Sequence, residues 1–219
     1  MLYLDFSQPI FDVNSIQTTN EFEESVKEFL VEWFSPSKVM IAHTSGSTGT
    51  PKEIILTKEN MRKSANMTAK YLHLQNGNSA LLAMPVTYIA GKLMLVRAVE
   101  IGLKLICIQP TSHISLDEIS RGISQEITSI DFVALTPMQV ENSIDFVSKC
   151  QKLIIGGAPL SEKVKKELFP FENEVYETYA MTETITHIAF KQVANQKFPY
   201  VKNAFEAFDE VKISQDDRG

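Results

Sequence analysis

The chain has 219 residues, of which 44% are hydrophobic and 22% are charged. Such a composition is typical of a water-soluble globular protein whose apolar core needs no disulfide bonds. The formal net charge of −6 argues against a broad surface for nucleic acid or for acidic membranes, although a local cluster of donors could still bind an anion.

Neither the cysteines nor the first residues indicate a secreted or membrane protein. Cys107 and Cys150 have no metal-type spacing and imply no disulfide framework, which fits the reducing cytoplasm. The opening residues, MLYLDFSQPIFD, lack the basic start and long apolar run of a signal peptide. No stretch reaches the roughly 18 apolar residues that a membrane span needs. We therefore expect a cytoplasmic protein without a membrane span.

The first predicted element is an amphipathic helix in NEFEESVKEFLVEWF (20–34). One face of it carries Phe22, Val26, Phe29, Leu30 and Trp33. Asn20 together with Glu23 resembles a capping box at its start. VMIAH (39–43) then predicts a buried strand. A polar loop follows, and EIIL (53–56) predicts a second strand.

After Thr57, which can cap a helix that reaches Leu72, strands and helices alternate. Further strands are expected at 79–84, 104–108, 131–135, 152–155, 174–178, 185–193 and 209–214. The helices between them are expected near 90–101, 116–128, 138–148 and 161–168. Strands separated by helical segments of about a dozen residues are typical of βαβ units. We therefore predict an α/β fold, with a mostly parallel β-sheet flanked by helices.

A sheet of this kind binds ligands in the crevice at the carboxyl ends of its strands. The loops after VMIAH, SALLAM, DFVAL, KLII and EVYET should therefore converge there. The length suits one domain, 1–219, or two subdomains, with 1–60 plus 177–219 in one and 61–176 in the other.

One of these loops, Thr44–Lys52 (TSGSTGTPK), has two glycines, five hydroxyl side chains and one lysine in nine residues. Gly46 and Gly49 allow backbone conformations and close approaches that other residues do not. Exposed N–H groups and hydroxyls could wrap a polyphosphate, and Lys52 adds positive charge. Because the lysine follows Pro51 and precedes a β-like EIIL, this is not the Walker sequence of P-loop NTPases, which runs into a helix. The alternative interpretation is an ordinary surface turn.

Three motifs, in this order, resemble those of the adenylate-forming superfamily, which includes acyl- and aryl-CoA ligases, luciferases and peptide-synthetase adenylation domains. TSGSTGTPKEI is similar to the phosphate-binding signature, with Glu53 where glycine is usual. IIGGAPLS (154–161) resembles the glycine-rich turn beside adenine. YETYAMTET (176–184) resembles the signature Tyr-Gly-Met-Thr-Glu, and Ala180 replaces its glycine, which would narrow the adjacent acyl pocket.

The resemblance implies a role for each matching residue. Tyr179 would stack near adenine, and Thr182 would contact the α-phosphate. Glu183 would hold Mg²⁺, which typically takes one or two carboxylates together with phosphates and water; taken alone, Glu183 would be read as a solvated strand-end carboxylate. Lys52, Thr182 and Glu183 are the implied catalytic residues. The implied nucleotide-binding residues are Thr44, Ser45, Gly46, Ser47, Thr48, Gly49, Thr50, Lys52, Gly156, Gly157, Ala158, Pro159, Glu177, Thr178, Tyr179, Ala180, Met181 and Thr182.

A fourth segment, MPVTYIAGKLMLVRAVEIG (84–102), resembles the Pro-x-x-His-x-x-Gly segment of o-succinylbenzoate–CoA ligases and the helix that follows it. Tyr88 replaces the histidine, and Gly91 permits close packing. Arg97 matches an arginine that would meet the distal carboxylate of the acid, with Lys92 as a second candidate. The alternative for Arg97 is a plain position on the helix surface. LTPMQV also resembles the segment beside the acyl pocket, so the implied substrate-binding residues are Tyr88, Gly91, Lys92, Arg97 and Thr136.

The implied reaction has two steps. The acid carboxylate attacks the α-phosphorus of ATP to give an acyl-adenylate and pyrophosphate, and the thiol of CoA then displaces AMP. ATP, Mg²⁺ and CoA are the implied cofactors, and no nucleophilic side chain is required. Only 43 residues precede the phosphate loop. In this short N-terminal portion the chain resembles the compact o-succinylbenzoate ligases of menaquinone biosynthesis.

Further expectations concern what these motifs leave open. The ribose-binding aspartate of the family, a later arginine and the lysine of a small C-terminal lid domain have no match, so we expect a fragment that lacks this domain and has little or no turnover. His187 either lines the site or is a plain strand histidine. The alternatives to o-succinylbenzoate activation are a ligase for another aryl or acyl acid and a non-catalytic nucleotide-binding module. We expect small-molecule partners and no nucleic acid. The sequence leaves open whether the protein forms a homodimer.

Overall fold

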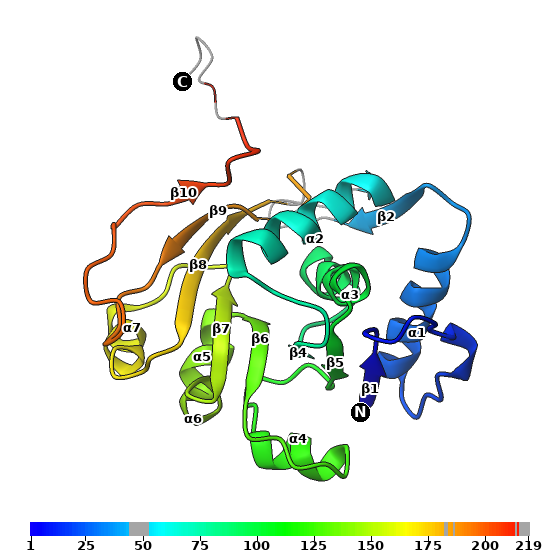
Figure 1. Cartoon of the computed structure of the whole chain (residues 1–219), viewed down its shortest axis with the longest axis horizontal. Coiled ribbons are helices and arrows are strands. Elements are labelled where there is room, and N and C mark those ends of the chain that lie inside the picture. The colour runs from blue at the N-terminus through cyan, green and yellow to red at the C-terminus, as the bar shows by residue number, and fades with distance from the viewer. Residues whose placement is uncertain (44–52, 182–183, 186, 213, 215–219) are drawn as a thin grey trace.

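The computed structural model describes residues 1–43, 53–181, 184, 185, 187–212 and 214. The strands of its main sheet are β1 (Leu2–Asp5), β4 (Ser79–Leu82), β5 (Lys104–Cys107), β6 (Ile130–Leu135), β7 (Cys150–Ile155), β8 (Glu174–Ala180), β9 (His187–Gln192) and β10 (Glu206–Ala207). Within the described residues they are ordered β1-β5-β4-β6-β7-β8-β9-β10 (Figure 1). The strands from β5 to β8 pair in parallel, whereas β1, β9 and β10 pair antiparallel. The predicted α/β fold with a mostly parallel sheet is confirmed.

Helices cover both faces of this sheet. They are α1 (Glu21–Phe34), α2 (Lys58–Leu72), α3 (Ile89–Ile101), α4 (Leu116–Gly122), α5 (Pro137–Asn142), α6 (Ile144–Val147) and α7 (Glu162–Leu168), with a 3-10 turn at Val13–Ser15. Successive strand residues point to opposite faces. In β4, Ala80 and Leu82 pack in the core beneath α1, α2 and α3, while Leu81 packs with residues of α4 to α7. The sheet therefore separates two apolar clusters.

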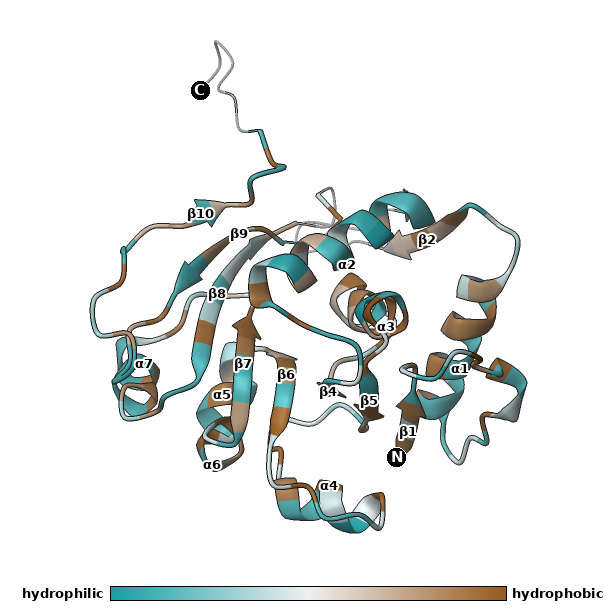
Figure 2. Ribbon diagram, in the orientation of Figure 1, coloured by the Kyte–Doolittle hydropathy of each residue, from teal (hydrophilic) through white to brown (hydrophobic). Residues whose placement is uncertain are grey.

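Helix α3 is buried between its neighbours. Every residue from Leu93 to Ala98 is buried, and one of them is the charged Arg97. A helix that is apolar on nearly all sides is typical of a core position. Figure 2 shows the contrast with α2, whose visible side is largely hydrophilic. The chain thus places an arginine where water does not reach.

A separate two-stranded antiparallel sheet is formed by β2 (Val39–His43) and β3 (Glu53–Thr57). The two predicted strands are confirmed, but the prediction that VMIAH is a buried strand is wrong. Met40 and Ala42 are buried, whereas Val39 and Ile41 are 41% and 45% exposed. The physical reason is that only one face of this hairpin meets the core, and a continuous apolar run does not reveal whether one or both faces are covered.

Polar contacts join α1 to the elements around it. Asn20 accepts a hydrogen bond from the N–H of Glu23, as the capping pattern predicts. The Glu23 carboxylate, however, accepts from Thr19 and pairs with the N-terminal ammonium instead of completing a capping box. At the other end, Lys58 Nζ donates to the carbonyls of Glu32 and Ser35 at 2.7 and 3.0 Å. These bonds fix the end of α1 against the start of α2.

Three predicted elements differ from the structure. The helix expected near 116–128 ends at Gly122, and the helix expected near 138–148 is divided at Ser143, whose hydroxyl accepts a hydrogen bond from the N–H of Ile114. The strand expected at 209–214 is wrong for its described residues, because 209–210 form a turn and the short β10 precedes them. In addition, β1 was not predicted. Its four residues form a strand by pairing with β5, about a hundred residues away in the sequence, so no local pattern indicates it.

Among the residues that the structure describes, no helix combines the length and the apolarity that a membrane crossing requires.

Gly91 provides a test of the packing at the start of α3. A Cβ atom at this position would lie 2.2 Å from the carbonyl oxygen of Pro85. We expect Gly91→Ala to lower the free energy of unfolding by about 1–3 kcal/mol, because backbone must move to admit the methyl group. The matched control is Gly122→Ala, where the Cβ would meet only the movable end of the Met1 side chain. Equal urea midpoints for the two variants would contradict this account of α3.

Candidate functional site

The carboxyl ends of the parallel strands define one edge of the main sheet. Because β4, β6, β7 and β8 are neighbours and parallel, the segments that follow them meet at this edge. The hairpin of β2 and β3 forms its own sheet, so VMIAH, contrary to the prediction from the sequence, is not one of the strands whose carboxyl ends make up this edge. It reaches the same edge through Lys92, at the start of α3, whose Nζ donates to the carbonyl of Ile41 at 2.7 Å.

The glycine-rich turn after β7 lies against β8. The N–H of Gly156 donates to the carbonyl of Leu135 at 3.1 Å, which continues the pairing of β6 and β7. A Cβ on Gly156 would lie 2.8 Å from Oγ1 of Thr178, so the close approach favours glycine. Gly157 has φ +93°, a conformation that L side chains rarely adopt. The residues of this turn from Gly157 to Pro159 are exposed, and their backbone is accessible to a ligand.

Glu177 and Thr178 are both used by the protein to shape this turn. The Glu177 carboxylate is 4% exposed, accepts a hydrogen bond from the N–H of Leu160 at 2.9 Å and pairs with Lys191 at 2.7 Å. The Thr178 hydroxyl donates to the carbonyl of Ile155 at 3.2 Å. Both side chains were predicted as nucleotide-binding residues, and the structure places them beneath the turn, where they hold it to β8.

The end of β8 presents an exposed surface beside the turn. Tyr179 is 50% exposed and Met181 is 47% exposed, and a register shift lies between Tyr179 and Ala180. Phe205 lies near Tyr179, with ring centroids 6.0 Å apart in an edge-to-face arrangement. Sequence reasoning did not single out Phe205. An exposed aromatic face next to exposed backbone is suited to a planar heterocycle, which can stack on the ring and hydrogen-bond to the turn.

Behind this surface lies a buried polar cluster of Thr68, Arg97 and His187. Arg97 is 3% exposed, so the alternative of a helix-surface position is wrong. Its Nε lies 3.4 Å from Thr68 Oγ1 and its Nη2 lies 3.5 Å from His187 Nε2. His187 pairs with Ala180 across the β8–β9 ladder. The fold therefore brings Arg97, from α3, next to the strand end that carries the Tyr-Ala-Met segment.

The charges in this cluster follow from its burial. Burial lowers the pKa of Arg97 to about 9, so the guanidinium stays charged at neutral pH. Burial, and then the positive charge of Arg97, lower the pKa of His187 well below its ordinary value. His187 is thus neutral at neutral pH and supplies no second cation. Its ring packs against Phe190 and Phe208, with centroids 4.6 and 5.7 Å away.

The other residues predicted to bind the acid lie around the same edge. Tyr88 is the N-cap residue of α3 and is 53% exposed. Lys92 holds the hairpin, and desolvation lowers its pKa. Thr136 forms a capping box with Gln139 at the start of α5. The Gln139 amide also donates to the carbonyls of Ala83 and Thr111 at 2.8 and 2.9 Å, which ties the ends of three strands together.

The predicted phosphate loop, Thr44–Lys52, and the predicted pair Thr182–Glu183 lie outside the described residues. Their flanks are described. Strands β2 and β3 lead into and out of the loop. Beside the Thr182–Glu183 pair, the N–H of Met181 donates to the hydroxyl of Thr184, and the carbonyl of Met181 accepts from the hydroxyl and the N–H of Thr184. Across the described ranges, no group of three or more His, Cys, Asp or Glu side chains could hold a metal ion.

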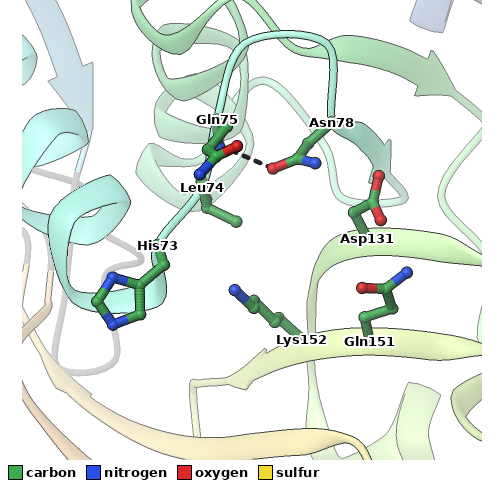
Figure 3. A pocket seen from close by; sticks show the side chains of 7 residues that line it. All are labelled: His73, Leu74, Gln75, Asn78, Asp131, Gln151 and Lys152. Carbon is green, nitrogen blue, oxygen red and sulfur yellow. Dashed lines mark hydrogen bonds between the residues drawn. The ribbon is translucent and has the colours of Figure 1, made fainter.

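A polar hollow of about 210 Å³ lies at the opposite edge, by the amino ends of β6 and β7 (Figure 3). Its polar groups serve the fold: Asp131 accepts from the N–H and hydroxyl of Ser79, and Lys152 Nζ donates to the carbonyl of Leu72. We do not assign the site here, because the described residues of the predicted motifs lie at the carboxyl edge. The residues that line the hollow are His73, Leu74, Gln75, Asn78, Asp131, Gln151 and Lys152.

The buried neutral state of His187 has a measurable consequence. The unfolded chain binds a proton at this residue more readily than the folded chain, so the free energy of unfolding should fall as pH drops below about 6.5. For one histidine kept neutral in the fold, the loss at pH 5.5 is about 1.4 kcal/mol. His187→Phe removes the titrating group and should reduce the decline. Urea unfolding between pH 7.5 and 5.5, where carboxylates stay ionised, measures it; identical declines in both proteins would refute the assignment.

Comparison with known proteins identifies the family. The model of the family described as "AMP-binding enzyme" matches residues 7–218. The chain is 26% identical over 185 residues to a 2-succinylbenzoate–CoA ligase of Bacillus cereus, covering 82% of this chain and 37% of that protein. This chain therefore spans well under half the length of that relative.

Solved structures show the same fold. An AMP-forming acyl-CoA synthetase/AMP-acid ligase II-like protein from Dyadobacter fermentans superposes with a TM-score of 0.80 at 31% identity, covering 94% of this chain and 58% of that one. The O-succinylbenzoate coenzyme A synthetase of Bacillus subtilis, in complex with ATP and magnesium ion, superposes with a TM-score of 0.63 at 21% identity, covering 80% of this chain and 37% of that one. With its family model matched from residue 7 to residue 218 and its sheet built as in these ligases, the chain belongs to the AMP-binding enzyme family.

Proposed function

We propose that this chain is the ATP- and acid-binding part of an AMP-forming acid–CoA ligase. The observation that carries the proposal is the arrangement at the carboxyl edge of the sheet. An exposed glycine-rich turn and the exposed Tyr179 lie side by side on β7 and β8, with the charged Arg97 buried behind them. The turn and Tyr179 suit a nucleotide base, and Arg97 suits an anionic group of a second substrate.

In this proposal Tyr179 and the turn from Gly156 to Pro159 hold adenine. The loop Thr44–Lys52 surrounds the phosphates, and Thr182 contacts the α-phosphate. Attack of a carboxylate on the α-phosphorus brings two anions together, so the lysine, the hydroxyls and the loop N–H groups would offset their repulsion and stabilise charge in the transition state. Magnesium held by Glu183 would neutralise part of the phosphate charge. In the second step, the CoA thiol displaces AMP from the acyl-adenylate.

The acid that we propose is o-succinylbenzoate. It has two carboxylates, so one can be activated while the other pairs with a fixed cation. Arg97 is such a cation, and its guanidinium suits a carboxylate because its donors are arranged in a planar fork. Support also comes from the relatives, since a 2-succinylbenzoate–CoA ligase of Bacillus licheniformis is 31% identical over 157 residues, although these cover 31% of its length.

The role of Arg97 can be measured with a non-hydrolysable analogue of o-succinylbenzoyl-adenylate. Calorimetry on Arg97→Ala should show a loss of about 1–3 kcal/mol in binding free energy, because a charged hydrogen bond is removed. Arg62→Ala is the matched control, since Arg62 is an exposed arginine of α2 that pairs with Glu100. Equal affinities for wild type and Arg97→Ala would remove Arg97 from the acid site.

The 219-residue polypeptide itself is expected to bind ATP with magnesium weakly and to form little or no CoA thioester. The reason is that two residues implied by the resemblance, the ribose-binding aspartate and the lysine of the lid domain, have no match in it. Calorimetry with ATP and chromatographic detection of the thioester test the two parts of this expectation. Thioester formed by this polypeptide above the background of Lys52→Ala would contradict it.

A further inference from the structure

Thr68 and His187, two described polar residues that the proposed function does not use, lie close to Arg97. Thr68 comes from α2 and His187 from β9, while Arg97 itself comes from α3. Thr68 is 0% exposed and His187 is 4% exposed. Three polar side chains from three elements thus meet inside an apolar core, where each unsatisfied polar group would cost free energy.

The shortest of the contacts described among these three side chains joins Thr68 to His187. Thr68 Oγ1 and His187 Nε2 are 2.8 Å apart and share one hydrogen, whereas the two contacts that Arg97 makes with them, at 3.4 and 3.5 Å, are long for N–H donors. Thr68 Oγ1 also lies 3.1 Å from the carbonyl of Ser64, one turn earlier in α2. The threonine and the histidine therefore hold each other, and the guanidinium lies against the pair.

The position of the histidine ring is fixed from its other sides as well. Phe190 and Phe208 pack against the ring, and the backbone of His187 is paired with Ala180. The ring is neutral, so the guanidinium of Arg97 carries the positive charge of the cluster. A rigid neutral wall beside the guanidinium limits the directions in which its donors can point.

We infer that Thr68 and His187 are positioning residues, which aim the guanidinium of Arg97 at the second carboxylate of the acid and so set the preference for a dicarboxylic over a monocarboxylic acid. The inference rests on the proposed function, because it requires that Arg97 contacts the acid. It differs from a purely structural role in one respect. A structural defect weakens every ligand alike, whereas a misplaced guanidinium weakens only the ligand that has the second carboxylate.

The test compares two acyl-adenylate analogues on the full chain. One carries o-succinylbenzoate, and the other carries 3-benzoylpropionate, which has the same skeleton without the ring carboxylate. The quantity measured by calorimetry is the ratio of their dissociation constants. We expect Thr68→Val and His187→Phe to reduce this ratio about fivefold or more, with the affinity for the monocarboxylate analogue unchanged. Thr68→Ser, which keeps the hydroxyl, and His187→Gln, which keeps a polar group, should recover part of the ratio.

Ser64→Ala is the matched control. It removes a buried hydroxyl from the same helix, and within the described part of the chain that hydroxyl makes no hydrogen bond. Circular dichroism establishes that each variant is folded, and the conservative variants carry the test if Thr68→Val or His187→Phe does not fold. The control should leave the ratio unchanged.

The outcomes separate the inference from the proposed function. If the wild type prefers the dicarboxylate analogue and Arg97→Ala abolishes that preference, the proposed function stands. Unchanged ratios in the Thr68 and His187 variants would then overturn the inference alone. Equal losses for both analogues would also overturn it, because they indicate a structural role. If the wild type binds both analogues equally, or neither, the proposed acid site and the inference are both overturned.

Discussion

The parallel pairing of β6, β7 and β8 is the constraint on which the candidate site depends. Leu135 pairs with Ile155, and Ile155 pairs with Glu177, so β6 and β7 end level with Glu177, while β8 continues beyond them to Ala180. That register places Gly156 against Thr178 and exposes the turn that follows. Because side chains alternate along a strand, a shift of one residue in β8 would turn Thr178 away and bring Tyr179 into the core.

Strand β9 returns antiparallel beside β8, within the same sheet. It places His187 opposite Ala180 and beneath α2 and α3, where it meets Thr68 and Arg97. Burying a charged arginine in an apolar helix costs free energy unless the guanidinium is hydrogen-bonded. A buried arginine is therefore uncommon in protein cores. The combination of an exposed aromatic edge with a buried cation behind it is what favours a binding function for this region.

Local patterns predicted much of the fold because they depend on neighbours in the sequence. The amphipathic period of α1 and the apolar runs of β4 to β8 follow from burial on one or two faces. The predictions failed where contacts with residues far away in the sequence determine the local structure. The four residues of β1 form a strand through β5, the division between α5 and α6 falls where Ser143 bonds to Ile114, and the exposed side of β2 depends on what the hairpin packs against.

The sequence by itself determined the class of fold and the order of most of its elements, because glycines, hydroxyl residues and apolar periods have local physical meanings that survive without coordinates. The family was indicated by the resemblance of three motifs. The sequence also selected Arg97, yet it left open whether that side chain lies on the surface. Only the tertiary structure decided that Arg97 is buried beside Thr68 and His187, and that Glu177 holds the glycine-rich turn by accepting from Leu160. The physical reason is that burial and hydrogen-bond partners arise from packing between segments far apart in the chain, and no local pattern encodes which of them will meet.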